Sequence, residues 1–425
     1  MLRSLYSAIS GLHGHQEMLD VIANNIANVN TTGYKASRVS FEDILSQTEH
    51  GATAPSGGLG GINPAQVGLG MTVAGIDVLQ TQGNLQSTGK LTDMAIQGDG
   101  FFVLSDGAQQ YYTRDGSFDT SLDGSLVNPA SGLKVQGWQA DSTGTIDTTG
   151  PLKNLVIPIG QQIAPQATAN ATVTGNLDAS ATQNTSTDPA NPTAGSTVST
   201  TLTVYDSLGA SHQIDLTFTN QGSGAWNVAA TDPNDPTDKP SLSVSSLSFT
   251  STSSPGTLDT STTSTLTLTF GSSSGSTTTL SSTVDFSSMT QFAAPSDPSA
   301  TADGYPSGQL TTFSVGSDGQ ISGVYSNGHS QVLGQIALAS FRNPAGLLRD
   351  GDNNFITSSA SGQASVGVPG SGDRGSVLTG TLEMSNVDLA TEFTEMIAAQ
   401  RGFEANTRVI TTSDQMLQDL VNLRQ

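Results

Sequence analysis

The C-terminal stretch 385–423 constrains the fold more than any other part of the chain. Five apolar residues recur there at a strict seven-residue step, and they are Leu389, Met396, Phe403, Ile410 and Leu417. A seven-residue step is typical of a helix with one apolar seam. Ser385 and Asp388 stand where a capping box would start that helix. The second row of the seam is more polar and consists of Phe393, Gln400, Thr407, Asp414 and Val421, with Leu420 beside it. Because burying an unpaired Asp414 would be costly, we do not expect apolar neighbours on every side of the helix.

The first 30 residues carry a matching pattern. Apolar positions alternate steps of three and four, at Leu2, Leu5, Ile9, Leu12, Leu19 and Ile26, with Gln16 and Ala23 in the same row and Ile22 beside it. Isolated helices are marginal in water, so neither stripe is expected to stand alone. The simplest joint arrangement packs the two chain ends together and leaves the rest as a long insert. Two unrelated amphipathic helices on a β-rich core are the alternative. The periodicity does not say whether the partner belongs to the same chain or to a neighbour.

Between these ends the composition favours β-structure with many turns. Only 35% of the 425 residues are hydrophobic and 12% are charged, while glycine numbers 47. Ser, Thr, Gly, Asn and Asp in such proportions suit strands and turns better than long helices. The length predicts about two to four domains.

Local signals place several hairpins in the insert. Residues 101–104 and 111–114 are predicted to pair across a short loop, and residues 202–205 and 214–218 across another. Asp318-Gly319 and Asn327-Gly328 between apolar runs are strong hairpin signals. Apolar residues alternate with hydroxyls over 241–290, at Leu242, Val244, Leu247, Phe249, Leu266, Leu268 and Phe270. This alternation predicts half-buried antiparallel strands. The glycine-rich stretch 51–70 is predicted to be a loop, and 181–200 has a composition that also suits disorder.

Together these signals predict an α+β, multidomain fold. We expect the N- and C-terminal helices to pair as a coiled-coil-like inner domain, with nested, predominantly antiparallel β domains between them. The expected boundaries are 1–30 with 385–425 for the helical domain, 31–92 with 356–384 for an extended connector, 93–159 with 301–355 for a middle β domain, and 160–300 for an outer, Ser/Thr-rich β domain.

Charge and cysteine content exclude several classes of function. Lys and Arg total 14 against 36 Asp and Glu, a formal net charge of −22. Such a surface repels phosphate backbones and anionic membranes, so we expect no nucleic-acid partner and no membrane insertion. The chain has no cysteine, which excludes disulfides and thiolate metal sites. We find no apolar run long enough to span a bilayer, and charged residues interrupt the N-terminus, so we expect no cleaved signal peptide.

The sequence offers little for catalysis. His13 and His15 are two residues apart and point to different faces of a helix, which does not suit a metal pair. The stretch Asp350–Asn354 resembles a calcium loop only superficially, since an EF-hand would need Gly where Phe355 stands and an acid where Ser361 stands. Phosphate-binding and nucleophile motifs are missing. We therefore expect no enzyme activity, no metal and no cofactor, although paired carboxylates in an acidic β-protein leave a glycosidase as a formal alternative.

Residues 23–35, ANNIANVNTTGYK, resemble the N-terminal motif of the bacterial flagellar rod and hook proteins. The positions that carry this motif are Asn24, Asn25, Asn28, Thr31, Thr32, Gly33, Tyr34 and Lys35. Residues 82–89 (QGNLQSTG), 98–102 (GDGFF), 112–118 (YTRDGSF) and the tail through 400–403 (QRGF) are similar to segments shared by that family. Residues 204–209, 285–292 and 341–347 resemble its hook members in particular. Residues 235–280 match no pattern of the family.

The resemblance implies a structural role. Hook subunits polymerise outside the cell into a short curved tube that passes motor torque to the filament as a universal joint. The implied partners are other hook subunits, the distal rod protein, the hook-filament junction protein, a hook cap and the flagellar type III export apparatus. Export by that route would carry the chain out largely unfolded, which suits a chain without a signal peptide or disulfides.

On this interpretation the two helices assemble the subunits. The expected assembly residues are Leu2, Leu5, Ile9, Leu12, Leu19, Ile22, Ile26, Leu389, Phe393, Met396, Phe403, Ile410, Leu417 and Leu420. We also hypothesise that both tails are largely disordered in the monomer and fold on assembly, because one chain's seam is too polar to order them alone. A stiff distal rod protein is the nearest alternative, and a secreted β-rich adhesin with coiled anchors is a more distant one.

Overall fold

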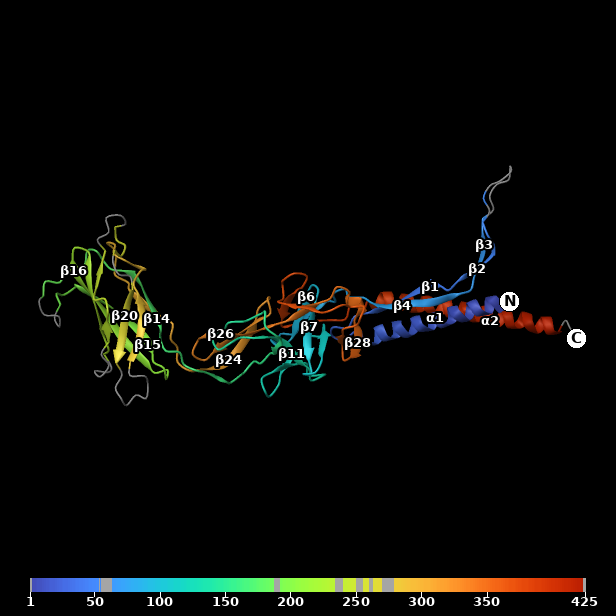
Figure 1. The fold of residues 1–425 in the computed structure, drawn as a ribbon, viewed down its shortest axis with the longest axis horizontal. Coiled ribbons are helices and arrows are strands. Elements are labelled where there is room, and N and C mark those ends of the chain that lie inside the picture. Colours follow the sequence, from blue (N-terminus) through green and yellow to red (C-terminus); the bar gives the residue numbers. More distant parts are fainter. Residues whose placement is uncertain are drawn as a thin grey trace. The chain divides into compact units, whose positions relative to one another are not determined.

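The computed structural model describes residues 2–52, 54, 63–186, 192–233, 240–249, 255–259, 263–269 and 279–422. A helix lies near each end of the chain, α1 (Leu2–Ala27) and α2 (Leu389–Asn422), and strands fill the sequence between them. The two helices lie side by side (Figure 1). The predicted α+β class with paired terminal helices is therefore confirmed.

The chain forms two compact units. The first contains Met1–Pro158, Phe313–Ser322 and Gln331–Gln425, and the second contains Ile159–Thr312 and Gly323–Ser330. The first unit holds both helices, so the termini and the adjoining β-structure are parts of one body. The finer four-part division of the chain stays a prediction.

Helix α2 begins after the cap that the sequence predicts. Asp388 accepts a hydrogen bond from the Ala390 N–H on Oδ1 (3.0 Å) and one from the Thr391 hydroxyl on Oδ2 (2.9 Å). These contacts satisfy a donor that the first helical turn leaves free. Ser385 lies one turn earlier, where its hydroxyl accepts from the Val387 N–H (3.3 Å), and it is not part of the helix.

Two antiparallel hairpins follow α1. Strand β1 (Ser37–Asp43) pairs with β4 (Met71–Val78), and this hairpin packs along α1. Strand β2 (Ser46–His50) pairs with β3 (Ala65–Gly68) and forms an arm (Figure 1). The prediction of a loop throughout 51–70 is wrong at 65–68, where backbone pairing with β2 creates a strand. Residues 53 and 55–62 of that stretch lie outside the described residues.

Two further strand pairs connect this region with the start of α2. Strand β5 (Leu85–Ser87) pairs with β32 (Thr381–Glu383), and β6 (Met94–Gln97) pairs with β31 (Ser376–Thr379). Both pairs join residues near 90 to residues near 380. They bring the segment that leads into α2 back to the residues that follow α1.

A larger antiparallel sheet follows in the first unit. Its order is β26 (Ser330–Ile336), β11 (Lys134–Gln139), β7 (Phe101–Ser105), β8 (Gln110–Thr113), β29 (Asn354–Ile356) and β28 (Leu348–Gly351). Short strands join it, namely β9 (Asp119–Thr120), β10 (Leu126–Val127), β12 (Lys153–Asn154), β27 (Leu338–Ser340) and β30 (Ser365–Gly367), and a 3-10 turn, η1 (Pro344–Gly346), follows β27. The predicted β7–β8 hairpin is confirmed. Part of the core consists of Phe101, Val103, Tyr112, Ala339, Leu347 and Phe355.

Three strands continue this sheet beyond β26. They are β13 (Gln162–Ile163), β24 (Gly308–Val315) and β25 (Gln320–Tyr325), and β24 and β25 each have residues in both units. The predicted turns at Asp318-Gly319 and Asn327-Gly328 join β24 to β25 and β25 to β26. Gly319 and Gly328 both have positive φ, at 75° and 79°, which explains why glycine stands at each turn.

The second unit contains two sheets around one apolar core. The first sheet holds β18 (Ser241–Leu242), β20 (Thr263–Thr269), β21 (Thr279–Asp285), β14 (Asn170–Asn176), β22 (Met289–Thr290) and β23 (Ser299–Ala302). The second holds β15 (Thr197–Tyr205), β16 (Ser211–Gly222), β17 (Ala225–Thr231) and β19 (Ser246–Ser248). The predicted β15–β16 hairpin is confirmed, and Trp226, Phe218 and Phe286 are fully buried between the strands.

Antiparallel pairing is not universal in this unit. Strand β14 pairs in parallel with β21 and β22, because the chain returns to it after more than 100 residues and not through a tight turn. The predicted strand residue Phe270, part of the 235–280 stretch, and residues 187–191 of the 181–200 stretch lie outside the described residues.

Candidate functional site

Small residues set the distance between α1 and α2. A Cβ placed on Gly11 would lie 2.7 Å from Asn406 Nδ2, and one placed on Gly402 would lie 2.4 Å from His15 Nε2. Each glycine therefore receives a side chain of the other helix. Glycine inside a helix costs about 1 kcal/mol relative to alanine, so close packing of the two helices accounts for its presence at these positions.

The buried line between the helices consists of small or polar residues. Ala8, Ala399 and Ser413 are buried there, while only Ile22 is a large apolar residue among the buried positions described in α1 and α2. This line runs beside the predicted heptad seam. Small side chains hold the helix axes close together, so the bulky seam residues are displaced to the flanks.

The predicted assembly residues consequently differ in burial. Ile22 is buried. Leu5, Leu12, Leu19, Ile26, Met396, Phe403, Ile410 and Leu417 are half-buried. Ile9, Leu389 and Phe393 are 53%, 40% and 50% exposed. The side chains of Leu2 and Leu420 lie outside the described part of the chain. A row of large apolar side chains therefore stays accessible along the pair, and Ile397, 59% exposed, belongs to it although the heptad analysis missed it.

The β1–β4 hairpin supports the other side of α1. The Met71 N–H donates to Ser10 Oγ (3.2 Å), and a Cβ on Gly14 would lie 2.4 Å from the Met71 methyl carbon. The ring of Phe41 lies 6.3 Å from that of His15. Helix α1 is thus held between α2 and the hairpin.

The motif residues Asn25 and Tyr34 fasten the end of α1. Asn25, 1% exposed, donates from Nδ2 to the Ser37 carbonyl (2.8 Å) and to Glu392 Oε1 (2.9 Å). Its Oδ1 accepts from the Ser37 N–H (3.0 Å) and from the Tyr34 hydroxyl (3.2 Å). One buried amide therefore connects α1, the residues that follow it and the first turn of α2.

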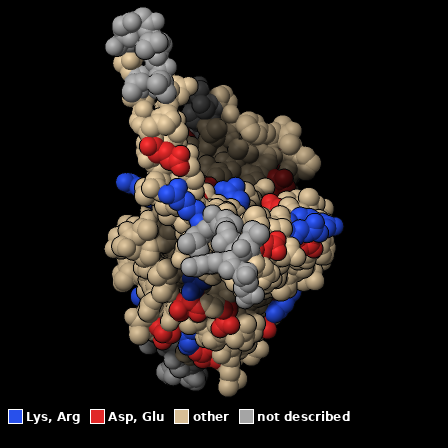
Figure 2. Space-filling model, turned by 90° about the vertical axis from the view of Figure 1, so that its right-hand side faces the viewer, with Lys and Arg blue, Asp and Glu red and all other residues tan. Residues whose placement is uncertain are grey.

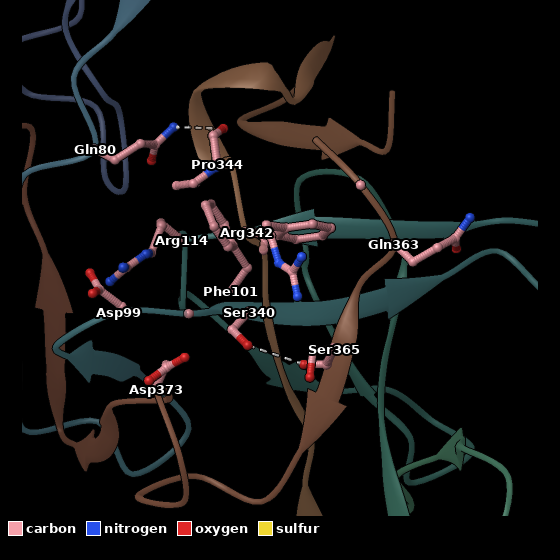
Figure 3. A pocket seen from close by; sticks show the side chains of 13 residues that line it. Gln80, Asp99, Phe101, Arg114, Ser340, Arg342, Pro344, Gln363, Ser365 and Asp373 are labelled. Carbon is pink, nitrogen blue, oxygen red and sulfur yellow. Dashed lines mark hydrogen bonds between the residues drawn. The ribbon is translucent and has the colours of Figure 1, made fainter. Parts of the chain in front are cut away.

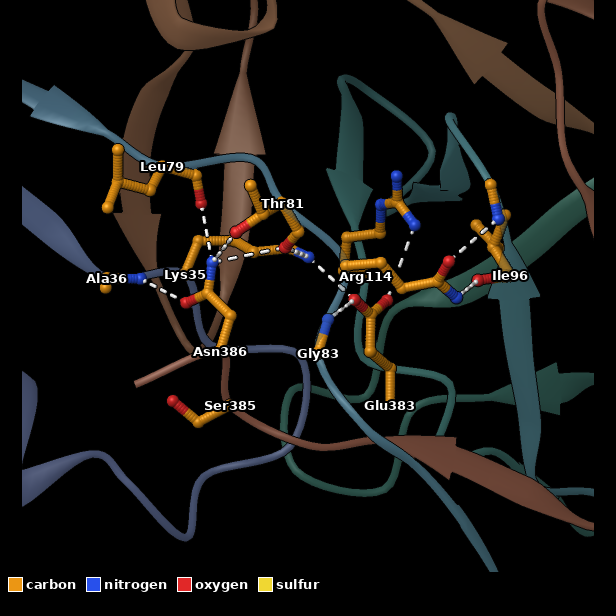
Figure 4. Close-up of polar contacts among 12 residues, drawn as sticks. Lys35, Ala36, Leu79, Thr81, Gly83, Ile96, Arg114, Glu383, Ser385 and Asn386 are labelled. Atoms are coloured by element: carbon orange, nitrogen blue, oxygen red, sulfur yellow. Dashed lines mark hydrogen bonds and ion pairs between the residues drawn. The ribbon is translucent and has the colours of Figure 1, made fainter. Parts of the chain in front are cut away.

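Lys35 belongs to a buried ion-pair cluster that is centred on Glu383 (Figure 4). Its Nζ lies 2.6 Å from Glu383 Oε1 and donates to the Thr81 carbonyl (2.8 Å). Arg114 Nη1 lies 3.4 Å from Glu383 Oε2, and the Gly83 N–H donates to Oε1 (2.9 Å). Lys35, Arg114 and Glu383 are at most 3% exposed in their side chains. Residues from three distant segments of the chain are tied together here.

Burial governs the electrostatics of this cluster. Removal from water lowers the pKa of Lys35 and of Arg114, and the carboxylate of Glu383 opposes that effect in both cases. At the first turn of α2, burial raises the pKa of Glu392, with Glu395 and Asp388 adding to the shift and the hydrogen bond from Asn25 opposing it. A buried ion pair fixes geometry more reliably than it adds stability, because desolvation offsets much of the attraction.

Asn386 adds a second tie beside the cluster. Its Oδ1 accepts from the Ala36 N–H (2.7 Å), and its Nδ2 donates to the carbonyls of Leu79 (2.9 Å) and Thr81 (3.1 Å) (Figure 4). Gly33 donates its N–H to the Glu383 carbonyl (2.8 Å). A Cβ on Gly33 would lie 2.5 Å from the Asp115 nitrogen, and Gly33 has a φ of +67°. Both the close approach of Asp115 and the left-handed backbone therefore require glycine here.

The remaining motif residues lie at the edge of this junction. Asn28 donates from Nδ2 to the Asn24 carbonyl (2.9 Å) and accepts from the Thr31 hydroxyl (3.1 Å), which shapes the turn after α1. The Thr32 hydroxyl donates to Asp115 Oδ1 (2.9 Å). The structure therefore brings five motif residues into one joint between α1 and the β-structure, namely Asn25, Thr32, Gly33, Tyr34 and Lys35. Asn24, Asn28 and Thr31 bond to one another at the end of α1.

Glu383, Arg114 and Asn386 are the residues of this joint that reasoning from spacing missed. Lys35 and Arg114 are two of only 14 Lys and Arg residues in the chain, and that scarcity of cations was the available signal. The partner carboxylate could not be chosen among 36 acids without the fold.

The described residues hold neither a cluster of metal ligands nor a helix that could span a membrane. Across these ranges, no group of three or more His, Asp or Glu side chains is placed to hold a metal ion. No helix in the described part of the chain combines the length and the apolar composition that crossing a membrane demands. On the face drawn in Figure 2, acidic and basic side chains lie intermixed among uncharged atoms. The site is thus a set of packing surfaces and a buried polar joint.

Four family models match the chain in sequence order. "Flagella basal body rod protein" matches residues 5–35, and "Flagellar hook protein FlgE/F/G D1 domain" matches 95–176. "Flagellar basal body protein FlaE D2 domain" matches 176–305, and "Flagellar basal body rod FlgEFG protein C-terminal" matches 378–423. The first and last of these models cover most of α1 and α2.

Relatives match over the whole length. The chain is 40% identical to the flagellar hook protein FlgE of Borreliella burgdorferi and 38% identical to that of Treponema pallidum, each over 100% of both chains. It is 32% identical, again over 100% of both, to the flagellar basal-body rod protein FlgG of Bacillus subtilis. A crystal structure of the Helicobacter pylori flagellar hook protein FlgE2 aligns with 70% of this chain and 99% of that one, at 14% identity and a TM-score of 0.45.

Proposed function

The chain belongs to the flagellar hook protein family, and on that premise we propose that it is a hook subunit that polymerises into a curved, flexible tube and transmits motor torque to the filament. The exposed apolar row on the helix pair carries this proposal. Ile9, Phe393 and Ile397 are each at least half exposed, although a single chain gains by burying such side chains. Copies of the chain that pack along these helices would bury them.

The architecture also suits a joint that bends. Helices that pack from subunit to subunit make a continuous wall, while the unit of residues 159–312 has a complete apolar core of its own. Contacts made by that unit with neighbours can then be weak and wet, which allows sliding without loss of the wall. Deletion of residues 160–300 is expected to leave export intact and to alter curvature or stiffness of the tube.

The partners follow from the same role. Assembly with other copies of this chain into hook and basal-body structures is implied by the family. We further assign as partners the distal rod protein, the hook-filament junction protein, a hook cap and the flagellar type III export apparatus, and an extracellular location reached by that export route. The lack of cysteine suits passage as an unfolded chain, because no disulfide has to be broken or formed on the way.

Phe393→Asp tests the role of the helix pair. The aspartate places a charge on the exposed row, so it should prevent tube formation while leaving the circular dichroism spectrum of the monomer unchanged. Glu404→Gln, on the exposed surface of the same helix, serves as control and should still form tubes. If electron microscopy shows that the Phe393→Asp protein forms tubes at the same concentration as the wild type, the proposal is wrong.

A distal rod protein is the second candidate, because the rod relative from Bacillus subtilis also matches from end to end. The two roles predict different polymers. A hook subunit gives tubes that bend and whose absence leaves the rod intact, whereas a rod subunit gives short stiff shafts. Imaging detached appendages from a strain without this chain separates the two.

A further inference from the structure

A pocket of about 800 Å³ opens in the first unit beside the buried ion-pair cluster (Figure 3). Its lining includes the aromatic residues Phe101 and Phe341 and Pro344 of η1. Arg114 and Arg342 also line it. The pocket thus joins apolar walls to guanidinium groups.

Arg114, a lining residue of this pocket, is incompletely hydrogen-bonded among the described residues. Nη1 pairs with Glu383, but Nε is buried and has no hydrogen-bond partner among the described residues. The residue is only 2% exposed and its guanidinium lies 5.3 Å from the centre of the Phe101 ring. Gln80, another lining residue, has an Oε1 that is likewise buried without a partner in the described structure. An unmade hydrogen bond on a buried charged group costs more than one on a neutral group, so an occupant is expected.

The charge of the cluster points to the kind of occupant. Lys35 and Arg114 are two buried cations, and Glu383 is the one carboxylate that pairs with both in the described structure. Asp99 attracts both cations from beyond ion-pair distance, and loss of water lowers the pKa of both. A carboxylate that reaches Arg114 directly would supply a second paired charge, with the planar two-point geometry that guanidinium favours.

Carboxylates of this chain line the pocket without making that pair. Asp99 and Asp373 stand at its rim, and both are exposed. Asp99 attracts the Arg114 guanidinium from a distance, but no ion pair within 4.0 Å joins them in the structure as described. Arg342, exposed at the mouth, also makes no ion pair among the residues described.

We propose that this pocket is the receptor for an acidic side chain of a second copy of the chain, whose carboxylate pairs with the free edge of Arg114. The inference rests on the proposed function, because only a polymer presents one copy to another in a fixed place. Acidic residues outnumber basic ones 36 to 14, so a neighbouring copy readily offers a carboxylate. The rings of Phe101 and Phe341 would cover its methylene groups, and Arg342 would attract it during docking.

Photo-crosslinking of full-length protein tests the proposal directly. A benzophenone amino acid replaces Gln363, an exposed residue of the pocket lining, and equal amounts of ¹⁵N-labelled and unlabelled copies are assembled and irradiated. The expected product joins a labelled to an unlabelled chain through a peptide that contains Asp or Glu, and dilute monomer gives none. A product within one chain, an inter-chain peptide without an acid, or no product in well-formed tubes overturns the proposal.

Arg342→Glu provides an independent measurement. Charge reversal at the mouth is expected to raise the critical concentration for assembly about tenfold. Lys153→Glu makes the same change at an exposed cation outside the pocket and should shift it less than twofold. Equal shifts in the two variants would contradict the inference while leaving the hook role intact. Failure of the unaltered chain to form tubes would instead count against the proposed function.

Discussion

The unit of residues 159–312 and the pair of terminal helices treat their large apolar side chains in opposite ways. In the unit, Trp226 and Phe218 are fully buried in one core that both sheets share. In the helix pair, Phe393 and Ile397 remain at least half exposed, and the buried line consists mostly of small residues. The unit is complete within one chain, whereas the helices keep their apolar rows for contacts that one chain does not supply.

Within a single chain, buried polar contacts fix the positions of the two helices at the end of α1 and the start of α2. Asn25, Lys35 and Glu383 tie the end of α1 to the β-structure and to the start of α2 through buried hydrogen bonds and ion pairs. Such ties specify geometry, because each group has few alternative partners once it is removed from water. Apolar burial thus stabilises the second unit, whereas polar contacts position the helix pair for assembly.

The largest expected effect comes from Trp226→Ala. Loss of a fully buried indole should destabilise the second unit by about 4 kcal/mol. Trp138, the other tryptophan, lies in the first unit, so its fluorescence in this variant reports that unit alone. We expect circular dichroism to show early loss of β-structure in denaturant while the Trp138 transition stays in place. Leu208→Ala, at a 58% exposed leucine of the same unit, is the control and should change little. A parallel shift of both transitions would break the comparison.

Period and turn chemistry predicted the elements of the fold well. The helices, the Asp388 cap and the hairpins at 101–114, 202–218 and 313–336 all arise from short-range patterns, and the structure confirms them. Parallel pairing of β14 with β21 was not predictable, because it depends on a return of the chain over more than 100 residues.

The site was predicted less completely. The heptad pattern indicates the helices but not the line on which they meet, because Gly11 and Gly402 bring the helix axes together and glycine carries no hydrophobic signal. The motif residues 24–35 were found by resemblance, but their partners Glu383 and Asn386 come from the other end of the chain. Only the fold brings those residues together.

Glu383→Gln should have the next largest effect. The change keeps the shape of the side chain but leaves Lys35 and Arg114 buried without a counter-charge, which should cost about 3 kcal/mol. Denaturant unfolding followed by fluorescence in a Trp226→Phe background, where Trp138 is the one tryptophan left, measures the loss in the first unit. Glu404→Gln breaks the exposed pair with Arg401 and should cost well under 1 kcal/mol. If the two variants unfold alike, the polar joint does not hold the helices and the comparison needs another explanation.

Gly33→Ala and Gly89→Ala form a matched pair that sharpens the account of the joint. Both glycines have left-handed φ, +67° and +73°, so both variants bear the same backbone strain of about 1 kcal/mol. Only at Gly33 would the new Cβ meet backbone, 2.5 Å from the Asp115 nitrogen, while at Gly89 nothing lies within 4 Å. We expect Gly33→Ala to be less stable by about a further 2 kcal/mol. Equal midpoints in thermal unfolding would show that the approach of the two segments is not tight.

The smallest effect is the pH dependence that Glu392 gives to the start of α2. Burial raises the pKa of its carboxyl above the ordinary value of 4.5, so the folded chain binds this proton more strongly than the unfolded chain does. The contribution to stability is therefore fully present below the ordinary pKa and is lost as the pH rises through the raised one. Amide exchange in α2 of the monomer, measured from pH 4 to pH 7, should become faster in the wild type relative to Glu392→Gln across that window.

Glu395→Gln is the control, because it leaves the bond from Asn25 to Glu392 in place and removes only a neighbouring charge. A constant ratio of exchange rates between wild type and Glu392→Gln would mean that this carboxyl does not link helix order to pH. Complete absence of protection in α2 at every pH would instead support helices that fold only on assembly. The helices would then differ from the second unit in folding itself, because that unit buries its apolar core within one chain.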